Sequence, residues 1–245
     1  MRLRSRPERA RKRQARHRPP GLPHLAGLLA ALLSLLAITA PAEARHHGAR
    51  SPAARQSGAR PGEFDYYLLS LSWSPTYCLT HPGDRDECGD RGYGLILHGL
   101  WPQFEDGGYP ENCQAAPLDA AARRQGATLF PSENLLRHEW QRHGSCSGLG
   151  ASDYLRTADR AVAQLVVPAE LSAPRHALHF SAAQLADHLR AANPRLPAGG
   201  LRIACSRDAL GEIRVCLTRS LQFRDCGAGV GGSCPSGDLR IPAAR

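Results

Sequence analysis

Short apolar runs bounded by glycine and proline predict the strands of this chain. The run from Phe64 to Trp73 is rich in aromatic and aliphatic residues and predicts a first strand, and Tyr93 to Leu100 predicts a second, buried one. Further along, Arg202–Cys205 and Ile213–Thr218 form a predicted hairpin with a turn through Gly211.

Three longer segments combine helical periodicity with capping residues. They are Ser132–His143, Ser152–Val166 and Ser181–Ala192, and the last opens with a capping box formed by Ser181 and Gln184. Strands and helices do not alternate regularly along the chain, so the pattern predicts an α+β fold.

The first 44 residues have the anatomy of a signal peptide. A basic start is followed by an apolar run from Leu25 to Ile38 and by the small-residue cleavage site Ala42-Glu43-Ala44. The run has about 15 residues, fewer than the roughly 20 that span a bilayer, and an uncleaved anchor is the alternative. Residues 45–62 lack large apolar side chains and predict a disordered linker, which leaves residues 63–245 as one domain.

The net charge of +9 is unevenly distributed along the 245 residues. Residues 1–44 hold nine basic and two acidic side chains, and residues 45–60 add four arginines without an acid. Residues 61–245 hold 18 basic and 20 acidic groups. The predicted domain is therefore slightly acidic, and its charge alone gives no reason to expect a polyanionic partner.

All eight cysteines lie beyond the predicted cleavage site, which is typical of an exported protein with four disulfides. Eight cysteines allow about 105 pairings, so spacing alone leaves the connectivity open, although the ends of the predicted hairpin could hold Cys205 against Cys216. No Cys-x2-Cys pair occurs, which disfavours a zinc site. The cysteines are Cys78, Cys88, Cys113, Cys146, Cys205, Cys216, Cys226 and Cys234.

The first chemical signal is His98, in the segment LHGLWPQ at residues 97–103, at the end of the second predicted strand. Its unperturbed pKa near 6.5 suits a general acid or base near neutrality. The alternative is a structural histidine bonded to the backbone.

The second signal is the segment HEWQRH at residues 138–143, on a predicted helix. At about 100° per residue, His138, Glu139, Arg142 and His143 fall within one arc of about 140°. The plain alternative is a solvated helix face. A zinc protease would have histidines four residues apart on one face, whereas these are five apart, so we expect no metal and no cofactor.

Without a metal, such a group can cleave a phosphodiester. Two histidines on opposite sides of the phosphate can act as base and acid, while a fixed cation stabilises the charge that grows on the phosphoryl oxygens. RNA supplies its own nucleophile, the 2′-OH next to every scissile phosphate.

Both segments resemble the active-site signatures of the ribonuclease T2 family, through HGLWP at residues 98–102 and HEWQRHGSC at residues 138–146. The segment YLLSLSWSP at residues 67–75, followed by Cys78, is similar to the opening of bacterial members. The resemblance runs from about Phe64 to Cys226. It implies a catalytic domain with a central antiparallel sheet, helices packed on it and disulfide staples.

The resemblance implies an endoribonuclease that cleaves single-stranded RNA with little base specificity, through a 2′,3′-cyclic phosphate that is then hydrolysed to a 3′-phosphate. His143 would be the general base on the 2′-OH and His98 the general acid for the leaving 5′-oxygen. His138 would hold the phosphate, and Glu139 with Arg142 would stabilise the phosphorane. Arg142 stands where the family usually has lysine, which keeps the cation but changes its shape, so we expect activity to be retained.

A base-binding pocket is implied just after the first signature, with Trp101 and Tyr109 as stacking faces. A purely core role is the alternative for Trp101. Gln103 occupies a position where some members have an aspartate that contacts the base, which leaves the base preference open.

The resemblance also implies a disulfide between Cys113 and Cys146. We expect the remaining pairs to be Cys78–Cys88, Cys205–Cys216 and, by elimination, Cys226–Cys234.

The expected protein is an exported monomer, periplasmic or secreted, that acts on RNA and not DNA and is free of the membrane after signal cleavage. Two other classes stay open: a secreted RNA- or protein-binding domain that has lost catalysis, and a zinc hydrolase. The three histidines and Glu139 argue against the first, because a pure binder needs no acid and base at set positions. Chelation distinguishes the second, because a metal chelator would abolish the activity of a zinc hydrolase and leave that of a metal-independent enzyme intact.

Overall fold

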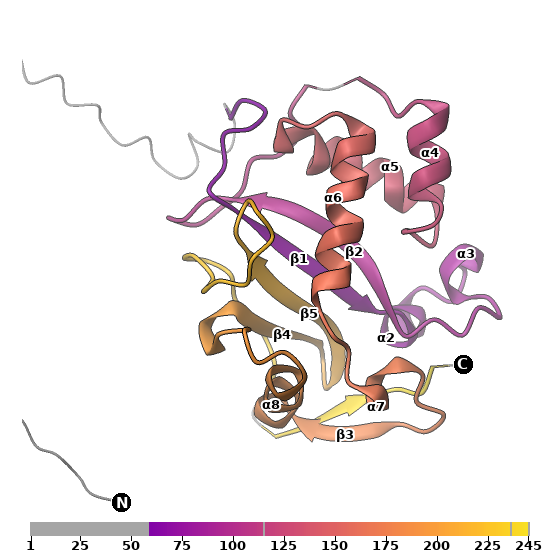
Figure 1. Cartoon of the computed structure of the whole chain (residues 1–245). Coiled ribbons are helices and arrows are strands. Elements are labelled where there is room, and N and C mark those ends of the chain that lie inside the picture. The colour runs from indigo at the N-terminus through magenta and orange to yellow at the C-terminus, as the bar shows by residue number, and fades with distance from the viewer. Residues whose placement is uncertain (1–58, 115, 236, 245) are drawn as a thin grey trace, which may run out of the picture. The chain divides into compact units, whose positions relative to one another are not determined.

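The computed structural model describes residues 59–114, 116–235 and 237–244 (Figure 1). All of them belong to one unit of the chain, residues 48–245. The predicted signal peptide and most of the predicted linker lie outside the described residues. No helix in the described part is both long enough and apolar enough to cross a membrane.

Six strands form one sheet in the order β2-β1-β5-β6-β3, with β4 paired to β5 off this path. All pairs are antiparallel except β5 with β6, which meet in one parallel pair, Ala209 with Arg240. The α+β prediction is confirmed, and the predicted antiparallel sheet carries one parallel contact. The bounds are β1 Tyr66–Trp73, β2 Leu95–Gln103, β3 Leu178–Ser181, β4 Leu201–Ser206, β5 Ala209–Leu217 and β6 Asp238–Ile241.

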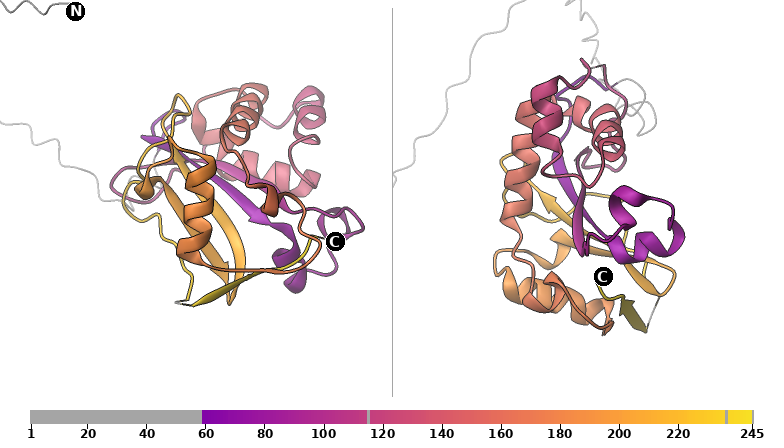
Figure 2. Two further views of the ribbon diagram at one scale, coloured as in Figure 1. Left: turned by 60° about the horizontal axis from the view of Figure 1, so that its bottom comes forward. Right: turned by 90° about the vertical axis from the view of Figure 1, so that its right-hand side faces the viewer.

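Helices α5 (Glu133–Arg142) and α6 (Ala151–Gln164) pack against β2, and α6 also contacts β1. Helix α8 (Ala182–Ala192) contacts β3 and β4. Figures 1 and 2 show α8 at the end of the sheet away from α4 and α5. The shorter helices are α2 Ser74–Thr80, α3 Arg85–Cys88, α4 Ala120–Gly126 and α7 Ala169–Ser172, with 3-10 turns η1 Gly144–Ser147 and η2 Ala198–Gly200.

Strand β1 is buried on both faces. One face, which includes Leu69 and Trp73, joins the main core under the helices. The other face, which includes Tyr66 and Leu68, forms a smaller cluster against which Trp101 packs. Because both faces are covered, the strand is nearly continuous in apolar residues instead of alternating with polar ones.

The three predicted helices are confirmed as α5, α6 and α8. Ser132 caps α5, because its side chain accepts a hydrogen bond from the backbone N–H of Leu135. The predicted capping box at α8 is present in both directions, between Ser181 and Gln184.

The predicted hairpin is present, but its turn comes before Gly211. Strand β5 begins at Ala209, and the turn passes through Arg207, whose φ of 58° lies in the left-handed region. Gly211 lies inside β5, where a Cβ atom would come within 3.1 Å of the carbonyl oxygen of Ala204. The glycine therefore permits close packing of β5 on β4, and the prediction of a turn there was wrong.

Two predicted disulfides are confirmed and two are wrong. Cys78–Cys88 and Cys113–Cys146 form as expected. The hairpin register explains the others, because Cys205 lies beside the turn opposite Leu210, whereas Cys216 lies at the far end of β5 opposite Leu68. The pairs that form are Cys205–Cys234 and Cys216–Cys226, in place of Cys205–Cys216 and Cys226–Cys234.

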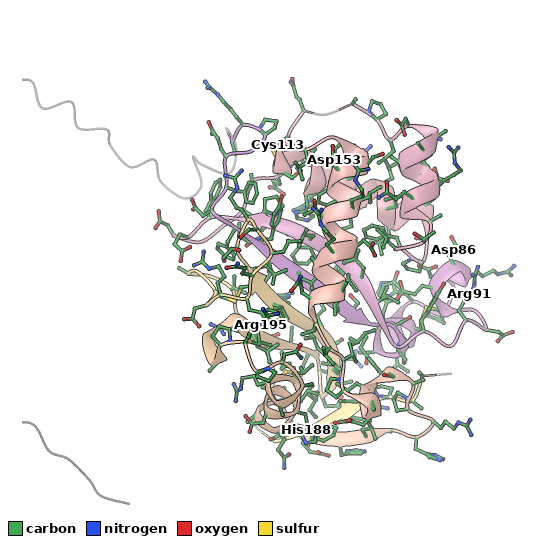
Figure 3. The ribbon with its side chains drawn as sticks, in the orientation of Figure 1. Asp86, Arg91, Cys113, Asp153, His188 and Arg195 are labelled. Atoms are coloured by element: carbon green, nitrogen blue, oxygen red, sulfur yellow. A yellow bond between two sulfur atoms is a disulfide. The ribbon has the colours of Figure 1, made fainter. Side chains whose placement is uncertain are left out.

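The disulfide of Cys113, which is labelled in Figure 3, ties the segment before α4 to Cys146 in η1 across a sequence separation of 33 residues. We predict that Cys113→Ala with Cys146→Ala lowers the free energy of unfolding by about 2–5 kcal/mol, measured by denaturant titration. The matched control removes Cys78 and Cys88, which are separated by only 10 residues. Its loss should be smaller by about 1 kcal/mol, because less loop entropy is released. A larger loss in the control would contradict this.

Candidate active site

His98 is the extra residue of a β-bulge in the middle of β2. The register pairs Gly99 with Ser70 and Leu97 with Leu71, so His98 has no partner on β1. A bulge redirects the side chain of the extra residue, and bulges are frequent beside active sites. The sequence had suggested that His98 lies at the end of the strand, but it lies inside the strand.

Helix α5 supplies the second half of the site at its C-terminal end. Glu139 is almost completely buried, and His143 is buried at the C-cap, where its backbone N–H donates to the carbonyl oxygen of Glu139. His138 is exposed and Arg142 is half-buried. Of the four residues on the predicted arc, Glu139 and His143 therefore face inward.

Trp101 joins the two halves. Its indole N–H donates to Oε2 of Glu139 at 2.6 Å, and its ring lies 5.0 Å from the ring of His98 and 5.1 Å from that of His143. The Nε2 atom of His98 lies 3.6 Å from Oε1 of Glu139. Trp101 is thus a bridge within the site and only partly a core residue.

The close approach of these groups requires glycine at position 99. A Cβ atom on Gly99 would lie 2.1 Å from Oε2 of Glu139 and 2.2 Å from the indole nitrogen of Trp101. Any larger residue would push the indole and the carboxylate apart.

Arg142 is held at the edge of the site. Its guanidinium forms an ion pair with Glu111 at 2.6 Å and donates to the hydroxyl of Tyr109 at 3.3 Å. The ring of Tyr109 lies 5.5 Å from that of His143. The structure therefore brings Tyr109 and Arg142 to the site together with Glu111, which the sequence did not single out.

Gln103 is placed differently from the other predicted base contacts. Its side chain is buried, and its amide donates to the carbonyl oxygen of Pro102 at 3.0 Å. Among the described contacts, this bond to the backbone is the one that the side chain of Gln103 makes.

Sequence reasoning missed Glu212 and Arg214. Oε1 of Glu212 lies 2.6 Å from Nδ1 of His98, and Oε2 lies 2.7 Å from Nε and 2.6 Å from Nη2 of Arg214. Arg214 lies over the ring of Trp101 at 6.0 Å. An acid and an arginine two residues apart, with the apolar Ile213 between them, share one face of a strand and were the available signal. The predicted strand began at Ile213, so the pair was overlooked.

The surroundings shift the pKa values of the two imidazoles in opposite directions. Burial, together with the nearby Arg142, lowers the pKa of His143 from 6.5 to about 3. Burial also opposes the charge on His98, but the hydrogen bond to Glu212 and the nearby Glu139 outweigh it and raise its pKa above 6.5. At a pH above about 3 and below the raised pKa of His98, the site therefore holds a neutral His143 and a protonated His98, which are the states of a general base and a general acid.

The two carboxyl groups also differ. Burial raises the pKa of Glu139 from 4.5 to about 7. Burial acts the same way on Glu212, but the hydrogen bond from His98 and the charges of His98 and Arg214 prevail and lower its pKa to about 2. Glu212 is thus an anion across the working pH range, whereas Glu139 exchanges a proton near neutrality.

In the part of the chain that the structure describes, no group of three or more His, Cys, Asp or Glu side chains is arranged to hold a metal ion.

Comparison with known proteins gives a consistent result. The model of the Ribonuclease T2 family matches residues 64–226. A ribonuclease of Aeromonas hydrophila is 50% identical over 103 residues, which cover 42% of this chain and 47% of that protein, so the match spans about half of its length. Ribonuclease DdI of Dictyostelium discoideum is 27% identical over 88% of this chain and 98% of its own. The fold matches that of the RNase-related protein from Calystegia sepium, with a TM-score of 0.62 and 22% identity over 75% of this chain and 99% of that one.

The opposite shifts can be tested by titrating the histidine side chains with heteronuclear NMR, using His98→Asn and His143→Asn to assign the signals. We predict that His143 loses its proton near pH 3 and is neutral above it, whereas His98 keeps its proton to above pH 6.5. Two histidines that titrate together near 6.5 would contradict the electrostatic account.

Proposed function

The chain belongs to the ribonuclease T2 family, and we propose that it is an endoribonuclease that cleaves single-stranded RNA by transphosphorylation. The observation that carries the proposal is the pair of imidazoles that both pack against the ring of Trp101, the half-buried His98 with its raised pKa and the buried His143 with its lowered pKa. The name ribonuclease borne by the Aeromonas and Dictyostelium relatives supports the same substrate class.

In the first step, neutral His143 takes the proton of the 2′-OH, and the 2′-oxygen attacks phosphorus. Protonated His98 gives its Nε2 proton to the 5′-oxygen as the P–O5′ bond breaks. The products are a 2′,3′-cyclic phosphate and a new 5′-hydroxyl. In the second step the roles are exchanged: His98 takes a proton from water, and His143 protonates the 2′-oxygen, which leaves a 3′-phosphate.

Glu139 and Arg142 act on the phosphorane that forms within each step, after the nucleophile attacks phosphorus and before the leaving group departs. Oε2 of Glu139 is already bound by Trp101, whereas Oε1 is buried without a hydrogen-bond donor among the described residues. Since burial raises the pKa of Glu139 to about 7, the protonated carboxyl can donate from Oε1 to a phosphoryl oxygen. Arg142 supplies a fixed cation, and we propose that exposed His138, whose charge contributes to the lowered pKa of His143, binds the phosphate.

Base binding falls to Trp101 and Tyr109, whose rings border His143. Aromatic stacking accepts every base, so we propose little base specificity. Gln103 bonds to the backbone of Pro102, and a contact from its side chain to the base would require that bond to break.

We also propose that the protein is exported by its signal peptide and works as a monomer in the periplasm or outside the cell. Four disulfides and no free cysteine among the described residues support an oxidising compartment.

A binding domain without catalysis is the competing function. It gives no reason for a histidine with a raised pKa and a histidine with a lowered pKa to share one site.

The chemistry can be tested with RNA and DNA of one sequence. We expect RNA to yield 2′,3′-cyclic phosphate ends and DNA to stay intact, because only RNA has the 2′-OH, with end groups identified by mass spectrometry. The RNA rate should be unchanged in EDTA. Cleavage of DNA at a comparable rate, or a loss in EDTA that zinc restores, would contradict the mechanism.

The two histidines can be tested separately. We predict that His98→Ala and His143→Ala each lower kcat by about 10²- to 10⁴-fold, the range for one proton-transfer role. The matched control is His188→Ala. His188, which is labelled in Figure 3, lies on α8 outside the site, and its Nδ1 is 2.7 Å from Oε1 of Glu170. A variant at position 98 or 143 that is no slower than the control would remove that histidine from the mechanism.

A further inference from the structure

We propose that Glu212 is a positioning residue for His98. The carboxylate of Glu212 fixes the orientation and tautomer of the His98 imidazole and keeps that imidazole charged until the leaving group departs. The inference rests on the proposed function, in which His98 is the general acid. It extends that function to a residue outside both sequence signatures.

The geometry of His98 assigns a direction to each of its nitrogens. Nδ1 lies 2.6 Å from Oε1 of Glu212, whereas Nε2 points to the other side, 3.6 Å from Oε1 of Glu139. An ionised carboxylate accepts only, so Nδ1 must carry the hydrogen of that bond. The proton available for transfer is therefore the one on Nε2, which faces the cluster of Trp101 and Glu139.

The position of Glu212 in the sheet makes it a rigid partner. It lies in β5, opposite Ser72 of β1 and Ala204 of β4. Its side chain is only 16% exposed, and Oε2 is held by two nitrogens of Arg214. The carboxylate is thus fixed by the backbone on both sides and by an ion pair.

Small residues on β1 let the pair form across a strand. Strand β1 lies between β2, which carries His98, and β5, which carries Glu212. The intervening positions of β1 are Ser70, opposite Arg214, and Ser72, opposite Glu212. With serine at both, the redirected side chain of His98 can pass over β1 and reach the carboxylate.

The charges around His98 explain why the pair favours the imidazolium. Strand β5 presents an anion and a cation, α5 and its C-cap present a carboxyl and a neutral imidazole, and α3 adds a carboxyl further away. These groups are Glu212, Arg214, Glu139, His143 and Glu87. Among the described residues, Glu212 is the one that forms a hydrogen bond with the ring. The hydrogen bond and charge of His98, followed by the charge of Arg214, keep Glu212 ionised in spite of burial.

The role of Glu212 in the reaction is to stay ionised while the proton of His98 moves. When the P–O5′ bond breaks, its electron pair remains on the 5′-oxygen, which receives the Nε2 proton. The neutral ring keeps its Nδ1–H on Glu212 and therefore presents a free lone pair on Nε2. In the second step that lone pair accepts a proton from water.

The test compares Glu212→Gln and Glu212→Ala with the folded wild-type enzyme, on a dinucleoside phosphate and on uridine 3′-(4-nitrophenyl phosphate). The matched control is Glu170→Gln, which removes the carboxylate from the surface pair with His188, at 2.7 Å compared with 2.6 Å for Glu212 and His98. Because 4-nitrophenolate leaves without protonation, cleavage of the second substrate needs the base but not the acid.

For Glu212→Gln we expect kcat on the dinucleoside phosphate to fall about 10²-fold and the upper limb of its kcat/KM profile to move about one pH unit lower. The rate on the nitrophenyl substrate should stay within about threefold of wild type. Glu212→Ala should lose more on the dinucleoside phosphate and equally little on the nitrophenyl substrate.

Two results would overturn the inference: an upper limb that stays in place in both variants, or equal losses on the two substrates, which would indicate a structural role. Failure of the proposed function is distinguishable, because the wild-type enzyme would then release no cyclic phosphate from either substrate.

Discussion

Two imidazoles in one cluster, the buried His143 and the half-buried His98, must hold opposite charge states, and the rest of the site serves this constraint. Burial alone would make both neutral. His98 escapes because two carboxyl groups lie at its two nitrogens, at 2.6 Å and 3.6 Å. His143 has a cation, Arg142, as its chain neighbour, and among the described residues its Nδ1 has no partner. The division of labour between acid and base thus follows from where the carboxylates lie.

Backbone geometry creates this arrangement. The bulge in β2 turns His98 across β1 toward β5, and the end of α5 places His143 one turn beyond Glu139. Trp101 can reach Glu139 only because Gly99 has no side chain. The disulfide at Cys146 fastens the segment after α5 to the loop that carries Tyr109 and Glu111. A sheet strand and a helix end, both rigid, therefore hold the reacting groups, as a preorganised site requires.

The parts that local patterns encode were predictable from the sequence. Helix α5 with its Ser132 cap, the capping box of α8 and the buried strand β1 depend on neighbours a few residues apart. The bulge at His98 was not predictable, because it appears only when β2 is aligned with β1. The role of Glu212 was not predictable either, because it depends on a contact across a strand. The disulfides of Cys205 and Cys216 depend on the register of the hairpin, which was predicted wrongly because Gly211 was taken as the turn. What failed was the long-range pairing, which one sequence does not determine.

The pH dependence of kcat/KM on a dinucleoside phosphate, measured for the wild type and for the two histidine variants, tests the central claim most directly. His143 must be neutral, so activity should rise as the pH passes its lowered pKa near 3, and His98 must be protonated, so activity should fall as the pH passes its raised pKa above 6.5. The residual activity of His143→Ala should lack the acid limb, whereas that of His98→Ala should keep the acid limb and lose activity at alkaline pH only through Glu139, whose pKa is about 7. A wild-type profile with one limb only, or the same limbs in both variants, would contradict the assignment of one acid and one base.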